Sequence, residues 1–191
     1  MSKNIDELPE GGMGLKIMST LADNLSYRRS YDDKNCLSIV KKYEKKSIQK
    51  RGILERLNWF KDKGHTTQDS NTPLQKIHLQ VNSELQALEQ VLDWYEQLKN
   101  QPIPQQVFQQ CQLVLAEGFT NVVRHAHQGL PSETPIELEV TVFKESLESR
   151  IWDYGQPFDL EAKVNELKEI DQDLLLTSNG FAHLGNVSIH R

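Results

Sequence analysis

Three polar side chains recur at helical spacing in the stretch from residue 111 to residue 127. Glu117, Asn121 and His125 stand at i, i+4 and i+8, so an α-helix would align them along one edge. Gly118 weakens such a helix by about 1 kcal/mol relative to alanine, but it lets another group approach the backbone closely. A carboxylate, an amide and an imidazole beside an apolar stripe indicate a helix that holds a ligand. A polar row is also the usual boundary between core and solvent, so this alternative stays open.

A second candidate group follows further along the chain, between Ile151 and Asp159. Asp153 is expected at the end of a strand, and Gly155 permits a tight turn directly after it. A carboxylate in such a place can accept a hydrogen bond from an exocyclic amine, as on adenine. The Asp-x-Gly pattern alone is a common turn. Together with the polar-edged helix it is a much stronger signal.

The polar-edged helix has clear limits in the sequence. It is expected to begin near Gln105, because Pro102 and Pro104 break the chain before it, and Gly129 and Pro131 end it. Its apolar part is assigned to Leu113, Val114, Ala116, Val122 and Val123.

Other elements are expected around this helix. Patterns of apolar residues and turns predict strands over Ile77–Val81, Ile136–Phe143 and Ser149–Trp152, with a turn over 145–147, and helices over Glu84–Lys99 and from Phe158 to about Ile170. Asn82 or Ser83 is expected to cap the helix over 84–99. Its buried face is predicted to be Leu85, Leu88, Val91, Leu92 and Tyr95.

These residues resemble a known family. The pattern Glu117-x-x-x-Asn121-x-x-x-His125-Ala126, followed by Asp153-x-Gly155-x-x-Phe158-Asp159, is similar to the first two ATP-binding boxes of the GHKL ATPases. The resemblance is strongest to the bacterial anti-sigma-factor serine/threonine kinases and runs from about residue 77 to about residue 173. The third box of that family, Gly-Gly-x-Gly-Leu, is missing downstream. It stands instead at the front of the chain, as Gly11-Gly12-Met13-Gly14-Leu15.

The front of the chain looks like the end of that family's domain. Residues 11–15 are expected to open a helix over Lys16–Asn24, followed by a strand over 25–31, a turn over 32–35 and a strand over Cys36–Tyr43. A glycine cluster alone is often only a flexible amino-terminal turn. Here, a glycine box, a helix and a hairpin follow one another in the family's order.

The sequence therefore divides into four parts. Residues 1–43 resemble the carboxy-terminal part of the ATPase domain, residues 76–173 its amino-terminal part, and residues 174–191 stay unassigned. Residues 44–75 are polar and turn-rich, with a short amphipathic helix expected around residues 53–60, and are expected to be a linker. Three arrangements explain this order: a circular permutation, which we favour, an exchange of residues 1–43 between two chains, or a remnant of another domain.

The resemblance implies a complete ATP site with Mg²⁺. Asn121 would supply an oxygen ligand to Mg²⁺, Asp153 and Gly155 would face the adenine, and Glu117 would be the general base. Backbone donors near the phosphates would come from Gly11, Gly12, Gly14 and Leu15. His125 would support the phosphate side, or it is an ordinary helix histidine satisfied by a neighbour. Arg124 is expected to face solvent.

The resemblance also implies a function and a fold. The first hypothesis is an ATP-dependent serine/threonine kinase that phosphorylates a serine on an anti-sigma antagonist and so regulates transcription by partner switching with a sigma-like factor. The alternatives are a kinase-inactive module that binds ATP or sequesters its partner, and a structural remnant. The implied fold class is α+β, a two-layer α/β sandwich of the Bergerat type. Its sheet is mixed and mostly antiparallel, and helices cover one face.

Composition limits the other possibilities. The chain has 191 residues with a formal net charge of −5, which argues against direct binding of nucleic acid. We expect a cytoplasmic protein without a membrane segment, because the sequence has no run of 18 apolar residues and no signal peptide. Cys36, expected in a strand, and Cys111, expected in a helix, are expected to be thiols without a disulfide or metal. A homodimer is possible and would be required by segment exchange.

Overall fold

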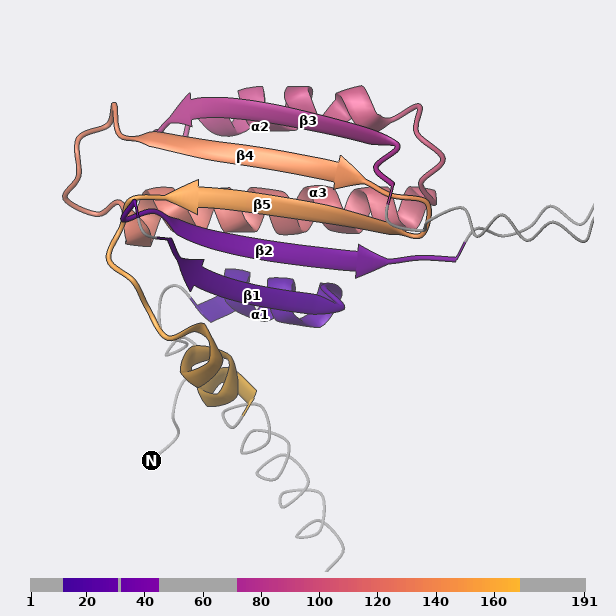
Figure 1. Cartoon of the computed structure of the whole chain (residues 1–191). Coiled ribbons are helices and arrows are strands. Elements are labelled where there is room, and N and C mark those ends of the chain that lie inside the picture. The colour runs from indigo at the N-terminus through magenta and orange to yellow at the C-terminus, as the bar shows by residue number, and fades with distance from the viewer. Residues whose placement is uncertain (1–11, 31, 45–71, 169–191) are drawn as a thin grey trace, which may run out of the picture.

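Two segments far apart in the sequence build one antiparallel sheet in the computed structural model, which describes residues 12–30, 32–44 and 72–168. Every neighbouring pair of strands is antiparallel, and the labelled α-helices lie on one face of the sheet (Figure 1). The α+β, two-layer fold class expected from the sequence is therefore confirmed, although the sheet of the described residues is wholly antiparallel rather than mixed. In sheet order the strands are β1 (Asn24–Arg29), β2 (Asn35–Lys42), β5 (Ser146–Asp153), β4 (Pro135–Val142) and β3 (Gln75–Asn82). The helices are α1 (Gly12–Leu21), α2 (Ala87–Tyr95) and α3 (Gln105–Asn121), with a 3₁₀ turn η3 (Glu96–Leu98), a π-helical turn η4 (Val122–Ala126) and a helix over residues 160–168.

The contact between β2 and β5 joins the front of the chain to its later part. The register runs from the pair Asn35–Asp153 to the pair Lys42–Ser146, so the two strands pair along their whole length. On the other side of the sheet, β4 separates β5 from β3. The described part of residues 1–43 is thus built into the same sheet as the later strands.

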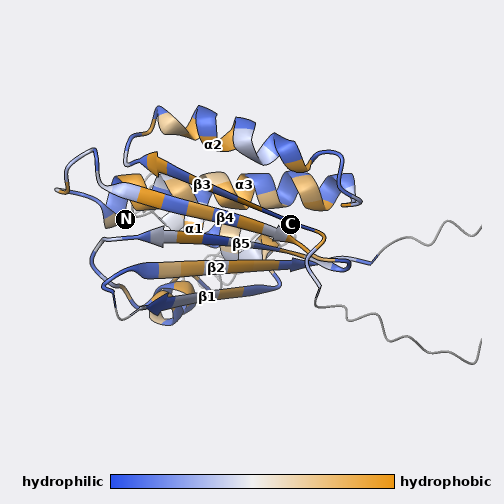
Figure 2. Cartoon of the chain, turned by 45° about the horizontal axis from the view of Figure 1, so that its top comes forward, coloured by the Kyte–Doolittle hydropathy of each residue, from blue (hydrophilic) through white to orange (hydrophobic). Residues whose placement is uncertain are grey.

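Alternation along the strands decides which side chains face the helices. In β5, the buried residues are Leu147, Ser149, Ile151 and Asp153, one at every second position. Ile151 reaches the backbone of α3, so this set faces the helix layer. The same alternation is visible as bands of hydropathy along the strands (Figure 2). Asp153, a carboxylate, is therefore placed on the face that is otherwise apolar.

The opposite face of the sheet carries paired charges. Arg150 lies 2.8 Å from Glu148 on its own strand and 3.5 Å from Glu139 on β4, and Lys76 on β3 lies 2.8 Å from Glu139. The pairs neutralise Glu139, which is only 9% exposed, with the more exposed side chains of Arg150 and Lys76. They explain why this face stays in water without a second helix layer.

The sheet-facing stripe of α3 overlaps only in part with the expected one: Val114 and Val122 are buried, whereas Ala116 and Val123 are only half-buried. Its buried side chains are Val107, Cys111, Val114, Leu115 and Phe119, followed by Val122 in η4. Leu113 was expected in this stripe, but it is 44% exposed because it lies on the outer side of the helix. Gly118 faces Ile151, and a Cβ built at Gly118 would lie 2.6 Å from Ile151 Cδ1. The close approach expected at Gly118 is therefore confirmed.

The expected start of α2 is wrong. The helix begins at Ala87 rather than Glu84, its N-cap is Gln86, and no side chain caps it. Turns occupy residues 83–86 instead: the N–H of Glu84 binds the carbonyl of Asn82, and the N–H of Ala87 binds that of Glu84. Leu85 lies in these turns, before the helix, and is 43% exposed instead of buried. Val91 and Tyr95 are fully buried, as expected.

Most other boundaries agree within a few residues, and α1 shows the largest shift. It starts at Gly12 and ends at Leu21, so Gly12 and Gly14 lie inside its first turn, while Gly11 lies outside the described residues. Asn35 was expected in a turn but begins β2. Cys36 lies in β2 and Cys111 in α3, both as free thiols. The expected helix around residues 53–60, nearly all of the linker over 44–75, residues 1–11 and the tail over 174–191 lie outside the described residues.

Membrane insertion through a helix finds no support in the described ranges. None of the helices within residues 12–30, 32–44 and 72–168 has the length and apolar character needed to cross a bilayer.

Candidate functional site

The first turn of α1 packs directly against the polar edge of α3. A Cβ built at Gly14 would lie 2.7 Å from Glu117 Oε2 and 3.1 Å from Asn121 Oδ1. These distances leave no space for a side chain at Gly14, so glycine is what allows the two helices to approach here. The first N–H groups of a helix have no acceptor within it. Free backbone donors, a carboxylate and an amide therefore come together at this point.

A cavity of about 340 Å³ lies beside this contact. Its walls are mostly apolar, and its polar lining includes Asn121, His125 and Asp153. Gly12 and Leu15 of α1 form part of the same wall. The volume falls within the range of small-molecule sites, which are concave, mainly apolar and supplied with a few polar groups.

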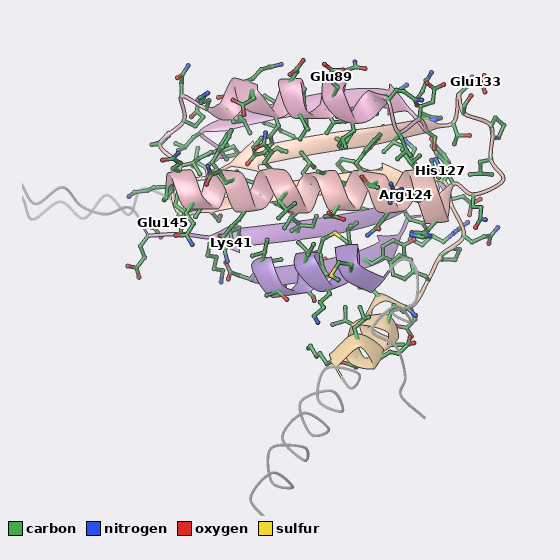
Figure 3. The ribbon with its side chains drawn as sticks, turned by 180° about the vertical axis from the view of Figure 1, so that it is seen from behind. Lys41, Glu89, Arg124, His127, Glu133 and Glu145 are labelled. Atoms are coloured by element: carbon green, nitrogen blue, oxygen red, sulfur yellow. The ribbon has the colours of Figure 1, made fainter. Side chains whose placement is uncertain are left out.

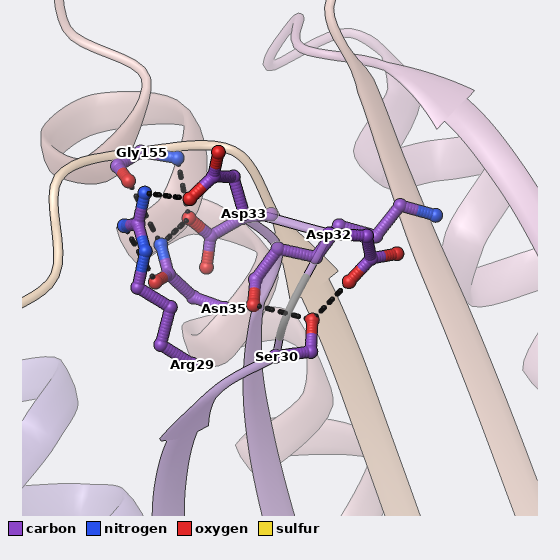
Figure 4. Close-up of polar contacts among 8 residues, drawn as sticks. Arg29, Ser30, Asp32, Asp33, Asn35 and Gly155 are labelled. Carbon is purple, nitrogen blue, oxygen red and sulfur yellow. Dashed lines mark hydrogen bonds and ion pairs between the residues drawn. The ribbon is translucent and has the colours of Figure 1, made fainter.

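Asn35 and Gly155 (Figure 4) hold Asp153 at the end of β5 through a set of buried hydrogen bonds. Its Oδ1 accepts hydrogen bonds from Asn35 Nδ2 at 2.9 Å and from the N–H of Gly155 at 2.8 Å. Asn35 Nδ2 also donates to the carbonyl of Gly155 at 2.9 Å. The carboxylate is 2% exposed and Asn35 is fully buried. Such a carboxylate is fixed in position while it still lines the cavity.

Beyond Asn121, α3 continues as one π-helical turn instead of stopping. In η4 the N–H of His127 binds the carbonyl of Val122, five residues back, at 2.8 Å. This widened turn brings His127 inward, where it is 3% exposed, while Arg124 and His125 remain exposed (Figure 3). The ring Nε2 of His127 accepts the N–H of Tyr154 at 3.0 Å. His127 thus ties the end of α3 to the turn that follows Asp153.

This hydrogen bond requires a neutral imidazole, which predicts a pH dependence of stability. Burial lowers the pKa of His127 below its ordinary value of 6.5, and the nearby charge of Asp153 opposes this effect only in part. A histidine with a lowered pKa in the folded chain binds fewer protons when folded. Its stabilisation is therefore complete above about pH 6.5 and is lost as the pH falls through the folded-state pKa.

We expect the free energy of unfolding, measured in urea, to fall between about pH 8 and about pH 5.5 more in the unaltered protein than in His127→Gln. Glutamine keeps a carbonyl acceptor for Tyr154 but does not titrate. His78→Gln is the matched control, because His78 is 52% exposed on β3. If His127→Gln loses as much stability over this range as the unaltered protein, the assignment of the pH dependence to His127 is wrong.

Gly155 lies against the backbone of Ala126. A Cβ built at Gly155 would collide with the carbonyl of Ala126, and its φ is not positive. Close approach, rather than an unusual backbone angle, is the reason for glycine here. The turn after Asp153 therefore rests directly on η4.

We expect Gly155→Ala to lower the free energy of unfolding by roughly 1–3 kcal/mol, because the added methyl group must displace backbone atoms. It should also weaken ligand binding in the cavity, since the displaced turn carries Asp153. Urea unfolding and a ligand titration measure the two effects. Gly129→Ala is the control: no atom lies within 4 Å of its Cβ position, although its φ of +85° adds strain. Equal effects of the two substitutions on ligand binding would contradict the importance of the Gly155 contact.

Tyr27 brings an unpaired hydroxyl to the same cavity. Its oxygen is buried and has no hydrogen-bond partner among the described residues. Burial raises the pKa of Tyr27, and the charge of Asp153 raises it further, so the phenol stays neutral. Its ring centroid lies 4.5 Å from that of Phe158. A flat, mostly apolar ligand with a few polar atoms, such as a purine base, fits these neighbours.

A larger and more open groove of about 610 Å³ lies on the other side of Tyr27 and Phe158, between β1 and the helix over 160–168. None of the site residues expected from the sequence lines it. The smaller cavity is therefore the candidate site.

The site residues expected from the sequence fall into three groups. Gly12, Leu15, Asn121, His125 and Asp153 line the cavity. Gly14 and Glu117 contact one another beside it, and Gly155 supports the Asp153 turn from behind. Gly11 lies outside the described residues. Arg124 is exposed, as expected.

The oxygen and nitrogen atoms at this site suit a cation that is bound mainly by water and by a ligand's phosphate. They do not suit a metal ion that is bound by protein side chains alone. Within the described ranges, no three His, Cys, Asp or Glu side chains are grouped closely enough to hold a metal ion. Asn121 Oδ1 offers one neutral oxygen next to the first turn of α1. Mg²⁺ is often bound through one or two protein oxygens, with phosphate and water as its other ligands.

Three residues near the cavity were missed by sequence reasoning. Asn35 was assigned to a turn, Tyr27 only to a strand, and His127 was passed over in favour of His125. For Asn35 and Tyr27 the only signal is the pairing of β2 with β5 and of β1 with β2, which local patterns do not contain. The inward position of His127 depends on the π-helical turn. An α-helical period of 3.6 places His125, not His127, on the edge that carries Glu117 and Asn121.

Comparison with known proteins gives one match. A family model described as a histidine kinase-like ATPase domain matches residues 81–182, about half of the chain. No curated protein and no solved structure matches. The matched range contains Asn121 and Asp153 but not the segment with α1, β1 and β2, which supplies the rest of the cavity wall.

Proposed function

The chain belongs to the histidine kinase-like ATPase domain family, and on that premise we propose that it is a serine/threonine protein kinase of the anti-sigma-factor type. Family membership implies an ATP-binding domain. The observation that best supports a complete ATP site is the single cavity lined by Gly12, Asn121 and Asp153. The first belongs to the front segment and the other two to the matched range, so the cavity depends on both.

Asp153 recognises the adenine in this proposal. Its carboxylate lines an apolar cavity, where a hydrogen bond from the exocyclic amine is stronger than in water. The hydroxyl of Tyr27, buried without a partner among the described residues, is a further donor or acceptor for the base. The apolar walls favour a flat ring over a free phosphate, so the base occupies this part of the cavity.

The phosphates then extend toward the first turn of α1. The first backbone N–H groups of this helix and its dipole favour an anion, and Gly12 places this turn at the cavity wall. Asn121 Oδ1 is the protein ligand for Mg²⁺ in this proposal, and His125 at the cavity wall supports the phosphate side. Mg²⁺, when bound, would neutralise part of the negative charge of the phosphates.

Glu117 acts as the general base. As the hydroxyl oxygen of the acceptor serine forms a bond to the γ-phosphorus, the bond from that phosphorus to the β,γ-bridging oxygen breaks and ADP leaves. Glu117 takes the hydroxyl proton. The carboxylate stands one helical turn from Asn121, beside Gly14, which fits a role next to the transferred phosphate.

The protein substrate follows from the resemblance to anti-sigma-factor kinases. We propose a serine on an anti-sigma antagonist as the acceptor and a sigma-like factor as the alternative partner, with phosphorylation deciding between them. ATP is used in the cytoplasm, so the proposal carries a cytoplasmic location.

A kinase-inactive module is the second candidate, and one observation favours it. Glu117 does not line the cavity but contacts α1 at Gly14. If this contact persists with ATP bound, the carboxylate cannot reach an acceptor hydroxyl. The chain would then bind ATP and sequester its partner without phosphorylating it.

We further propose that the chain is a circular permutation, with residues 44–75 connecting the two segments. The packing of α1 on α3 and of β2 on β5 within one chain fits a monomeric site. Exchange of the front segment requires at least a dimer, so the molar mass in solution distinguishes these arrangements.

Calorimetric titration with ATP tests the proposal at its base. Binding with Mg²⁺ present, and weaker binding when Mg²⁺ is chelated, is the expected result. Absence of any binding with Mg²⁺ present would exclude both the kinase and the ATP-binding module.

A further inference from the structure

Asn35 is a fully buried polar residue that neither the family match nor the sequence motifs include. It begins β2 and stands opposite Asp153 in the register. Both hydrogen atoms of its amide nitrogen are used, one by Asp153 Oδ1 and one by the carbonyl of Gly155. This arrangement concentrates the contacts of Asn35 on the turn that carries the proposed adenine carboxylate (Figure 4).

The orientation of the Asn35 amide is fixed by its neighbours. Its nitrogen faces two acceptors, so a flipped amide would place its oxygen against two oxygens. Its Oδ1 accepts a hydrogen bond from Arg29 at 3.4 Å, and Arg29 in turn pairs with Asp33 at 3.0 Å. Arg29 therefore holds the Asn35 amide from the solvent side. The amide has only one orientation in which its nitrogen faces Asp153 and Gly155.

The two oxygens of Asp153 have different surroundings. Both hydrogen bonds that the carboxylate accepts from the described residues, from Asn35 and from the N–H of Gly155, end on Oδ1. With Oδ1 occupied, Oδ2 is the oxygen left for a ligand in the cavity. A carboxylate without these two donors could rotate and offer either oxygen.

We infer that Asn35 is a positioning residue for base recognition: it holds Asp153 through Oδ1 so that Oδ2 accepts the exocyclic amine of adenine. This inference rests on the proposed ATP site. According to this inference, residues 12–44 supply a residue for adenine specificity, Asn35, as well as the glycines of α1. Replacing a buried polar pair by apolar residues of the same shape is often neutral or stabilising, so stability alone does not explain this pair.

Two nucleotides that differ only in the exocyclic amine provide the test. Binding of ATP and of purine riboside triphosphate, which lacks the amine, is measured by calorimetry for the unaltered protein and for Asn35→Ala. The unaltered protein should prefer ATP by about tenfold or more, as expected for a hydrogen bond to a charged acceptor. In Asn35→Ala this ratio should fall to within about threefold of unity, because Oδ1 of Asp153 then keeps only the N–H of Gly155 and the carboxylate is held less firmly.

Ser149→Ala is the matched control. Ser149 is buried on the same face of β5 as Asp153, four positions before it. Its substitution should leave the ratio of the two affinities unchanged. General loosening of the sheet would lower both affinities together and would not change their ratio. Thermal melting establishes that each variant is folded.

The outcomes separate the inference from the proposed function. If the unaltered protein binds no ATP, the proposed function fails and the inference with it. If it prefers ATP and folded Asn35→Ala shows the same ratio, only the role of Asn35 is overturned. Should Asn35→Ala fail to fold, Arg29→Ala decides, because Arg29 is 39% exposed and holds Asn35 from outside. A lower ratio in Arg29→Ala supports the inference, and an unchanged ratio overturns it.

Discussion

Asp153→Asn is expected to weaken ATP binding by roughly 10- to 150-fold, the effect of losing a hydrogen bond to a charged group. An asparagine here has no good orientation. If its oxygen faces Asn35 and the N–H of Gly155, its nitrogen faces the adenine amine, and two donors meet. If it is flipped, its nitrogen meets the donors of Asn35 and Gly155 instead. The first orientation replaces the hydrogen bond to adenine by a repulsive contact, and the second replaces both hydrogen bonds of the buried network.

Calorimetric titration of ATP measures this effect. Asp93→Asn makes the same change of charge on the exposed side of α2 and is the matched control. Its ATP affinity should equal that of the unaltered protein. If Asp153→Asn binds ATP as tightly as Asp93→Asn does, the adenine does not contact Asp153.

Glu117→Gln is expected to slow transfer of the γ-phosphate by about 10²- to 10⁴-fold, the usual contribution of a general base. ATP affinity should change little, because glutamine has the same shape and keeps the contact with Gly14. Water can replace the acceptor serine in the assay, so release of γ-phosphate in a single turnover is the measured quantity. No partner protein has to be identified for this experiment.

Glu89→Gln, an exposed substitution on α2, controls for the loss of one negative charge (Figure 3). An equal rate of γ-phosphate release in Glu117→Gln and Glu89→Gln would rule out Glu117 as the base. A different result is also informative: if the unaltered protein binds ATP but releases no γ-phosphate, the kinase-inactive module is the better description. The contact between Glu117 and Gly14 would then be the physical reason.

The central elements were predictable because their signals are local. The start of α3 follows from the prolines before it, and the expected start at Gln105 is confirmed, whereas the α-helix ends at Asn121, before the expected end at Gly129. Asp153 was expected at a strand end, and it is the last residue of β5. The proximity of Gly14 to Asn121 was expected only from the resemblance. The roles of these residues remain predictions.

What sequence reasoning missed depends on contacts between distant residues or on irregular geometry. Asn35 looks like an ordinary turn residue until β2 is paired with β5. His127 becomes a buried link only through the π-helical turn η4, which no local pattern announces. Leu113 is apolar but exposed, because the sheet covers only one side of α3.

The pairing of β2 with β5 also has a consequence for synthesis of the chain. Asn35 and Asp153 are 118 positions apart, yet each completes the surroundings of the other. During synthesis, α1 and β2 leave the ribosome before β5. Their apolar faces stay uncovered until β5 has been made. Long-range pairing of this kind folds slowly, and nucleotide cannot stabilise the nascent chain before the two strands meet. The early segment should therefore depend on chaperones more than its short length suggests.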